Sequence, residues 1–218
     1  MDAGVELLRP ALRAAVERLA LAVSEPQADA LLAYLALLQR WNAHYNLTAV
    51  RDPAQMLTQH LADCLAVVAP LRREIGANPA RLLDVGSGGG LPGVVIAILD
   101  PQIDVSCVDA VGKKAAFLQQ VAGELRLPNL HSHHARVEQM RAVPFDVVTS
   151  RAFASLVDFT GLTRQHLSPG GVWMAMKGKA PTDELAQLPE SVDVFHVEQI
   201  AVPGLNADRC LVWMRPRR

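Results

Sequence analysis

The chain has 218 residues, half of them hydrophobic, and a net charge of −1. This composition excludes a disordered chain and predicts one α/β domain with an appendage. Basic and acidic groups balance in both halves, 7 against 8 in residues 1–78 and 14 against 14 in residues 79–218, so any nucleic-acid contact depends on a local basic patch. Cys64, Cys107 and Cys210 lie far apart without a C-x-x-C pair, which favours free thiols in a reducing cytosol.

The chain shows no signal for a membrane or for secretion. Residues 1–6 are acidic and lack the apolar stretch of a signal peptide. No apolar run approaches the ~18 residues that a membrane helix needs. We therefore expect a cytoplasmic protein, a monomer, with no membrane partner.

Residues 1–75 predict a segment made only of helices. Apolar side chains at helical spacing predict a first amphipathic helix (Val5, Leu8, Leu12, Val16 and Leu19). Ser24-Glu25-Pro26-Gln27 has the pattern of a capping box and opens a second helix. Asp52-Pro53-Ala54-Gln55 opens a third, whose apolar residues run from Met56 to Val68. The polar residues 42–51 connect the last two helices.

Strands and helices alternate after a boundary at residues 77–80. The predicted strands are Arg81–Val85, Asp104–Asp109, Leu130–His134, Phe145–Ser150, Val172–Lys177, Val192–Ile200 and Cys210–Arg215. The predicted helices are Leu91–Leu99, Lys113–Leu125, Leu156–Gln165 and Thr182–Leu188. Such alternation predicts a mostly parallel sheet covered on both faces. Turn residues 203–208 alone join the last two strands, so the final strand enters antiparallel. The chain thus divides into a helical segment, 1–78, and a doubly wound α/β domain, 79–218, with six parallel strands and one antiparallel strand.

A glycine cluster follows the first strand, in Asp84-Val85-Gly86-Ser87-Gly88-Gly89-Gly90-Leu91-Pro92-Gly93. Gly86, Gly88 and Gly90 give the G-x-G-x-G of S-adenosylmethionine-dependent methyltransferases, whereas Gly88, Gly90 and Gly93 give the G-x-G-x-x-G of dinucleotide sites. Asp84 favours the first interpretation, because a carboxylate attracts a cationic sulfonium and ammonium but repels a pyrophosphate. The second pattern also begins late for a turn at the end of a strand. The sequence therefore favours the methyl donor.

Ligands of such sheets lie over the carboxyl ends of the strands, so the residues that follow each strand are candidates. Asp109, after the second strand, suits the ribose hydroxyls of an adenosine, or alternatively caps the next helix. Val137 and Glu138, after the third, suit an adenine ring, although Glu138 also fits an ordinary solvated acid. Arg151 follows the fourth strand, where the transferred methyl group is expected. Neither an Asn-Pro-Pro-Tyr loop nor a cysteine nucleophile stands there.

The guanidinium of Arg151 suits a phosphate, a carboxylate or the O6/N7 edge of guanine. Its alternative is a surface ion pair with Asp146 or Asp158. Lys113, Lys177 and Arg209 complete a candidate basic rim, for which solvated side chains are the other interpretation. His131 and His133 share a strand face, but no further ligand accompanies them, so we expect no metal.

Several motifs resemble, in order, those of the RsmG/GidB family of bacterial 16S ribosomal RNA guanine-N7 methyltransferases. The resemblance covers about residues 42–218 and is most specific in Ser150-Arg151-Ala152-Phe153-Ala154 and in Leu91-Pro92-Gly93. The other motifs are Asn46-Leu47-Thr48-Ala49-Val50-Arg51-Asp52-Pro53, His60-Leu61-Ala62-Asp63-Cys64-Leu65, Gly112-Lys113-Lys114, Arg136-Val137-Glu138, Met176-Lys177-Gly178 and Arg209-Cys210-Leu211-Val212. Gly89 and Cys210 depart from the family, where proline and histidine are common.

The resemblance implies a class I methyltransferase sheet, S-adenosylmethionine as methyl donor, and 16S rRNA or a small-subunit particle as substrate. By resemblance, the donor site would use Gly86, Leu91, Val137, Glu138 and Arg151, with Asp109 on the ribose. The glycine turn itself adds Asp84 and Gly88 to this predicted site. The basic rim and the polar residues of the helical segment predict RNA contacts at Asn46, Arg51, Lys113, Arg151, Lys177 and Arg209, with Arg151 at the junction of donor and target base. Guanine N7 is a lone pair without a proton, so transfer needs alignment and no general base. A small-molecule methyltransferase and an RNA-binding assembly factor are the rival hypotheses.

Overall fold

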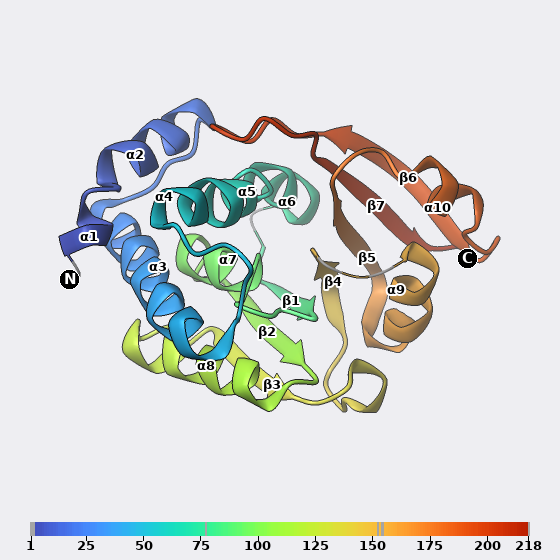
Figure 1. Cartoon of the computed structure of the whole chain (residues 1–218). Coiled ribbons are helices and arrows are strands. Elements are labelled where there is room, and N and C mark those ends of the chain that lie inside the picture. Colours follow the sequence, from blue (N-terminus) through green and yellow to red (C-terminus); the bar gives the residue numbers. More distant parts are fainter. Residues whose placement is uncertain (1–2, 77, 152, 154, 218) are drawn as a thin grey trace.

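The structure is a computed structural model that describes residues 3–76, 78–151, 153 and 155–217. Ala77 of the expected boundary, and Ala152 and Ala154 beside Arg151, lie outside the described residues. The centre of the fold is a seven-stranded sheet in the order β3-β2-β1-β4-β5-β7-β6 (Figure 1). Its strands are β1 (Ala80–Val85), β2 (Ile103–Asp109), β3 (Leu130–His134), β4 (Phe145–Ser150), β5 (Leu167–Lys177), β6 (Val192–Gln199) and β7 (Cys210–Pro216).

The strand directions confirm the predicted sheet. The five strands from β1 to β5 pair in parallel, whereas β7 runs antiparallel to both β5 and β6. The chain leaves β1 toward β2 and β3 on one side and continues through β4 and β5 on the other. The carboxyl ends of β1 and β4 therefore form the switch point at which ligands of doubly wound sheets bind.

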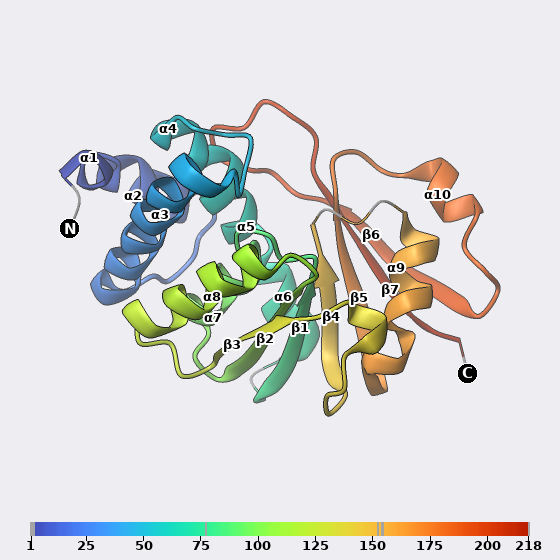
Figure 2. The same cartoon turned by 60° about the horizontal axis from the view of Figure 1, so that its bottom comes forward.

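Each face of the sheet is covered by its own helices. Leu82 of β1 pairs with Val105 and Val147 in the layer beneath α7 (Gly93–Leu99) and α8 (Gly112–Glu124). Leu83 and Val148, the next residues along, belong to the core on the opposite face, because strand side chains alternate. Figure 2 shows α9 (Leu156–Thr163) and α10 (Thr182–Ala186) on that second side.

The N-terminal segment is helical as expected, but its helices are more broken than predicted. The apolar stripe of residues 5–19 forms two helices, α1 (Ala3–Glu6) and α2 (Arg9–Arg18), because the chain turns ahead of Pro10. The predicted capping box forms at Ser24 and begins α3 (Glu25–Tyr45).

The third predicted helix is divided most. It comprises α4 (Pro53–Met56), a π-helix (Leu57–Ala62), α5 (Asp63–Leu65) and α6 (Val68–Ile75). A π-helix is uncommon and often marks a functional site.

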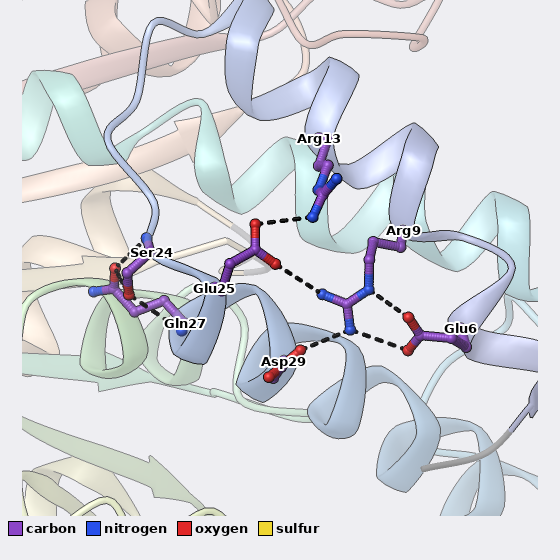
Figure 3. A network of polar contacts seen from close by, with 7 residues as sticks. All are labelled: Glu6, Arg9, Arg13, Ser24, Glu25, Gln27 and Asp29. Carbon is purple, nitrogen blue, oxygen red and sulfur yellow. Dashed lines mark hydrogen bonds and ion pairs between the residues drawn. The ribbon is translucent and has the colours of Figure 1, made fainter.

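A cluster of ion pairs holds the first helices together (Figure 3). The guanidinium of Arg9 contacts the carboxylates of Glu6, Glu25 and Asp29, the last at 2.6 Å, and Arg13 pairs with Glu25 at 2.9 Å. Most of these carboxylates are largely exposed, so each pair contributes roughly 0–1 kcal/mol and mainly fixes how α1 and α2 sit on α3.

The helical segment and the α/β domain share one hydrophobic core. Leu31, Leu35 and Leu38 of α3 are fully buried in the same cluster as Val94 of α7 and Phe117 of α8. The division of the chain into two domains, 1–78 and 79–218, stays a prediction. Among the described residues, no helix is long and apolar enough to cross a membrane.

Candidate functional site

Four of the five glycines after β1 form two pairs with different reasons for lacking a side chain. Gly86 and Gly88 have φ angles of +66° and +57°, and a Cβ on either would meet no atom closer than 3.9 Å. A Cβ on Gly90 would lie 2.4 Å from a side chain of α7, and one on Gly93 would lie 2.5 Å from Cys107 Sγ. Gly90 and Gly93 are therefore required by packing, whereas Gly86 and Gly88 line open space where a ligand can approach the backbone.

Asp84 lies beneath this turn and is completely buried. Its Oδ2 accepts a hydrogen bond from the Gly93 N–H at 3.0 Å, which fixes the start of α7. Its Oδ1 has no hydrogen-bond partner among the described residues. Burial raises the pKa of this carboxyl group to about 7, because the charged form loses its hydration. A nearby cation would favour the ionised form.

Asp109 stands at the end of β2 and connects two turns. Its Oδ2 accepts from the Gly88 N–H at 3.0 Å, and its Oδ1 accepts from the Val111 N–H at 2.9 Å. Lys114 Nζ lies 3.5 Å away. Val111 occupies the N-cap position of α8, so Asp109 holds the residue that precedes the helix. Each carboxylate oxygen has a second lone pair, which leaves acceptor capacity beside the open glycines.

The other candidate donor-site residues differ in accessibility. Val137 is 7% exposed and packs in the second core, and its carbonyl accepts a hydrogen bond from His166. Glu138 is exposed; its carboxylate forms a long ion pair of 3.9 Å with Arg136, and its carbonyl accepts a hydrogen bond from Gln165. Leu91 is 3% exposed and belongs to the main core, and its N–H is bonded to Ser87.

Arg151 reaches from the end of β4 to the π-helix. Its Nη1 lies 3.2 Å from the Gln59 carbonyl, 3.3 Å from His60 Nδ1 and 3.5 Å from Asp63 Oδ2. The alternative pairing with Asp146 or Asp158 is therefore wrong. Asp146 instead accepts hydrogen bonds from the Arg81 N–H and the Ser168 hydroxyl, and Asp158 accepts one from the Ser155 hydroxyl. Arg151 remains partly exposed at the carboxyl edge of the sheet, where the ligand is expected.

His60 is a neutral acceptor in this arrangement. A guanidinium can only donate, so Nδ1 accepts from Arg151 and Nε2 carries the proton toward Thr48 Oγ1, at 2.7 Å. Burial, with the adjacent charge of Arg151, lowers the pKa of His60 to about 4. The imidazole therefore orients Arg151 without adding charge.

Asp63 joins Arg151 to a second arginine. Its Oδ1 accepts from Arg209 Nε at 2.8 Å, while its Oδ2 faces Arg151. These groups line a cleft of about 340 Å³ between the π-helix and the ends of β4, β5 and β7 (Gln59, His60, Asp63, Arg151, Met176, Lys177, Gly178 and Arg209). We name it the two-arginine cleft.

Most of the chain matches a known protein family. Residues 27–212 match the GidB family, described as rRNA small subunit methyltransferase G. The chain belongs to this family. A Leptothrix cholodnii relative, named ribosomal RNA small subunit methyltransferase G, is 62% identical over 209 residues and covers 96% of both chains. One of that name from Acidovorax sp. strain JS42 is 63% identical over 214 residues and covers 94% of both.

Solved structures support the fold of this GidB protein. A ribosomal protein L11 methylase from Lactobacillus delbrueckii subsp. bulgaricus has a TM-score of 0.56 at 13% identity, covering 76% of this chain and 80% of its own. A SAM-dependent methyltransferase from Aquifex aeolicus has a TM-score of 0.55 at 15% identity, covering 75% and 98%. At such identities the likeness establishes the methyltransferase sheet alone.

The predicted RNA-binding residues of this GidB protein do not all gather in one place. Arg151, Lys177 and Arg209 line the two-arginine cleft, although Lys177 is neutralised by Glu184 at 2.8 Å. Asn46 and Arg51 are exposed and bonded to each other at 3.2 Å. Lys113 is exposed on α8. Within the described parts of the chain, no hydrogen bond or ion pair links these last three to the cleft.

Two residues of the GidB site carried no predicted role. Tyr34 of α3 is fully buried and donates a hydrogen bond of 2.5 Å from its hydroxyl to the Gly89 carbonyl, so the helical segment braces the glycine turn. Asp63 holds both arginines. A signal for Asp63 existed, because His60 and Asp63 interrupt an otherwise apolar helix face three residues apart.

For metal binding, the described residues offer no group of three or more suitable side chains. His131 pairs with Asp104 at 2.7 Å, and His133 lies 3.2 Å from the Ser106 hydroxyl. The two histidines of β3 therefore have hydrogen-bonding roles on the strand.

Proposed function

We propose that this protein transfers a methyl group from S-adenosylmethionine to N7 of one guanine in 16S ribosomal RNA. The observation that carries the proposal is the identity of about 60%, over nearly the whole length, with proteins named ribosomal RNA small subunit methyltransferase G. The site supports it with an open glycine turn beside two carboxylates and with a cationic cleft at the same edge of the sheet.

The residues present fit the cofactor. The space over Gly86 and Gly88 is the cradle that a Cβ would fill, and Asp109 beside it has free acceptor capacity for ribose hydroxyls. Asp84 Oδ1, which has no hydrogen-bond partner in the described part of the chain, favours a cationic ligand above the turn. S-Adenosylmethionine supplies an electrophilic methyl group when bound. Val137 and Glu138 are the residues that we assign to the adenine side.

The chemistry of the target atom matches the groups around the cleft. Guanine N7 holds an in-plane lone pair and carries no proton, so the enzyme must align it and need not deprotonate it. His60, the one histidine among the described residues that line the two-arginine cleft, has both ring nitrogens in hydrogen bonds and a pKa of about 4. It orients Arg151 and is unsuited to act as a general base near neutral pH.

The RNA substrate must be held largely by local contacts, because the chain carries a net charge of −1. We assign this role to Arg151 and Arg209 in the cleft, and to Asn46, Arg51 and Lys113 on the surface. A chain that is slightly negative overall suits a partly assembled small-subunit particle, which supplies further binding surface. We infer that the enzyme acts in the cytoplasm as a monomer.

Methylation of defined substrates tests the proposal. The purified protein is incubated with methyl-labelled S-adenosylmethionine and either naked 16S rRNA or small-subunit particles from cells that lack it. We expect label in a single 7-methylguanosine, located by mass mapping of nuclease fragments. Label in another nucleotide, or only in a small molecule, would refute the proposed target. Tight particle binding with no formation of S-adenosylhomocysteine would favour an assembly factor.

A further inference from the structure

The carboxylate of Asp63 is placed to fix two guanidinium groups at once. Its side chain is 3% exposed, and each of its two oxygens pairs with a different arginine: Oδ1 with Arg209 and Oδ2 with Arg151. Arg209 Nη1 is also held by the Asp208 carbonyl at 2.8 Å, and Arg151 by the Gln59 carbonyl. Both arginines are about one-quarter exposed, so their remaining N–H groups reach the cleft.

The two-arginine cleft keeps an excess of one positive charge. Two guanidiniums face one carboxylate, His60 is neutral, and the charge of Lys177 is balanced by Glu184. The cleft volume of about 340 Å³ is within the range of ligand sites. Among the described residues, no partner binds Arg151 Nε and Nη2 or Arg209 Nη2. Fixed donors with an excess positive charge suit an anion.

The reaction itself decides which part of the RNA these donors contact. A guanidinium that grips O6 and N7 of guanine would occupy the lone pair that must attack the methyl group. The purine also becomes cationic as the methyl group is transferred, so a positive charge beside N7 would oppose the reaction. A phosphate has neither disadvantage, and two guanidiniums neutralise it well.

We propose that Asp63 joins Arg151 and Arg209 into one binding site for a backbone phosphate of the RNA, near the target guanosine. Asp63 is a positioning residue, because it acts through the two arginines. The proposal rests on the proposed function for the identity of the RNA. It also relates the π-helix to the site, since His60 on the π-helix and Asp63 at the start of α5 both face Arg151.

Replacement of Asp63 distinguishes positioning from simple electrostatics, since the two predict opposite changes in how well the protein binds and methylates RNA. Asp63→Asn adds one positive charge to the cleft, so electrostatics alone would strengthen RNA binding. The amide has a single acceptor oxygen and turns its N–H donors toward one of the arginines. Positioning therefore predicts a loss of kcat/KM of tenfold to a hundredfold with an unchanged Kd for S-adenosylmethionine.

Glu184→Gln is the matched control. It removes one carboxylate beside the same cleft, at Lys177, and leaves both arginines held. We expect the control to keep its kcat and to bind particles as tightly as the wild type or more tightly. If Asp63→Asn behaves in the same way as this control, the cleft responds only to net charge and the proposal is wrong.

Arg209→Lys covers the case in which Asp63→Asn fails to fold. The lysine keeps the charge near Asp63 but loses the planar set of donors. We expect about a tenfold loss of kcat/KM, at an unchanged Kd for S-adenosylmethionine and an unchanged Tm. Wild-type kcat/KM in this variant would overturn the proposal.

Inorganic phosphate identifies the ligand class. We expect phosphate to compete with particles in the wild type more strongly than chloride at equal ionic strength and equal free Mg²⁺, and to lose this excess in Arg209→Lys. Equal inhibition by the two salts would overturn the phosphate assignment. A wild-type protein that methylates no rRNA would instead overturn the proposed function, and the RNA ligand with it.

Discussion

Asp84 is the residue whose replacement changes stability most informatively. Its carboxylate is fully buried, with Oδ2 on the Gly93 N–H and Oδ1 without a partner among the described residues. Asp84→Asn keeps an acceptor for Gly93 and removes the charge. The new amide donor would be buried without a partner, at a cost of about 1–3 kcal/mol that does not depend on pH.

The pH dependence follows from the raised pKa of Asp84. Below pH 3.8, its ordinary value, the group is protonated in both the folded and the unfolded state. Between 3.8 and about 7 the unfolded chain releases the proton while the folded protein keeps it, so stability falls as pH rises through this window. From pH 5 to pH 8 the free energy of unfolding of the wild type falls by about 3 kcal/mol through the titration of Asp84 alone.

Urea unfolding of the wild type and Asp84→Asn at pH 5 and pH 8 measures this effect. The difference between the two proteins cancels other titrating groups, including His60. We expect the free energy of unfolding of the variant, relative to that of the wild type, to rise by about 3 kcal/mol between pH 5 and pH 8. Asp183→Asn, at an exposed carboxylate of α10, controls for net charge. A pH-independent difference for Asp84→Asn would show that burial does not raise this pKa.

Cofactor binding gives a second readout of the same carboxylate. If the cationic end of S-adenosylmethionine lies near Asp84, binding favours the ionised form and releases a proton. Affinity in the wild type then rises with pH up to about 7, and calorimetry in buffers of different ionisation enthalpy detects the proton. Asp84→Asn should show neither effect. A wild-type affinity that is flat between pH 6 and pH 8 would place Asp84 away from the charge.

Three further substitutions test the assigned roles. Arg151→Lys should lose about 1–3 kcal/mol in kcat/KM, tenfold to a hundredfold, because lysine lacks the planar donors that bind Gln59, His60 and Asp63; wild-type kinetics would show an ordinary surface charge. Asp109→Ala should weaken S-adenosylmethionine binding by about 1–3 kcal/mol in calorimetry, and undiminished affinity contradicts its ribose role. Arg51→Ala should raise the KM for particles at a constant cofactor Kd; a change in the cofactor Kd instead argues against an RNA contact.

The sheet could be predicted because its signals are local. Each strand is a short apolar run bounded by turn residues, and the helix-free link at 203–208 determines that β7 is antiparallel. The glycine turn could also be predicted from the sequence, since Gly86, Gly88 and Asp84 lie within five residues of one another. What the sequence could not separate is why each glycine is needed. Gly90 and Gly93 lack side chains because of packing against α7, α8, Cys107 and Asp84, which only the folded chain brings close.

The partners of Arg151 could not be predicted, because they lie about 90 positions earlier in the chain. Its position after β4 indicated that it faces the ligand edge, and nearby carboxylates were the natural expected partners. The tertiary fold instead brings in the π-helix, which periodicity cannot detect. The buried leucines of the π-helix, Leu57 and Leu61, are four residues apart, a spacing that a regular helix fits equally well.

The contacts of the helical segment argue that it belongs to the catalytic unit. Tyr34 holds Gly89 in the turn that we assign to the cofactor, and Asp63 holds the arginines that we assign to the RNA. A change in the packing of α3 would therefore disturb the glycine turn through Tyr34, whereas a change at Asp63 on α5 would disturb the RNA side. Since α3 is buried against α7 and α8, residues 79–218 by themselves would expose a large apolar face. The helical segment thus stabilises the α/β domain and, through two buried polar side chains, shapes the edge where the donor and the acceptor must meet.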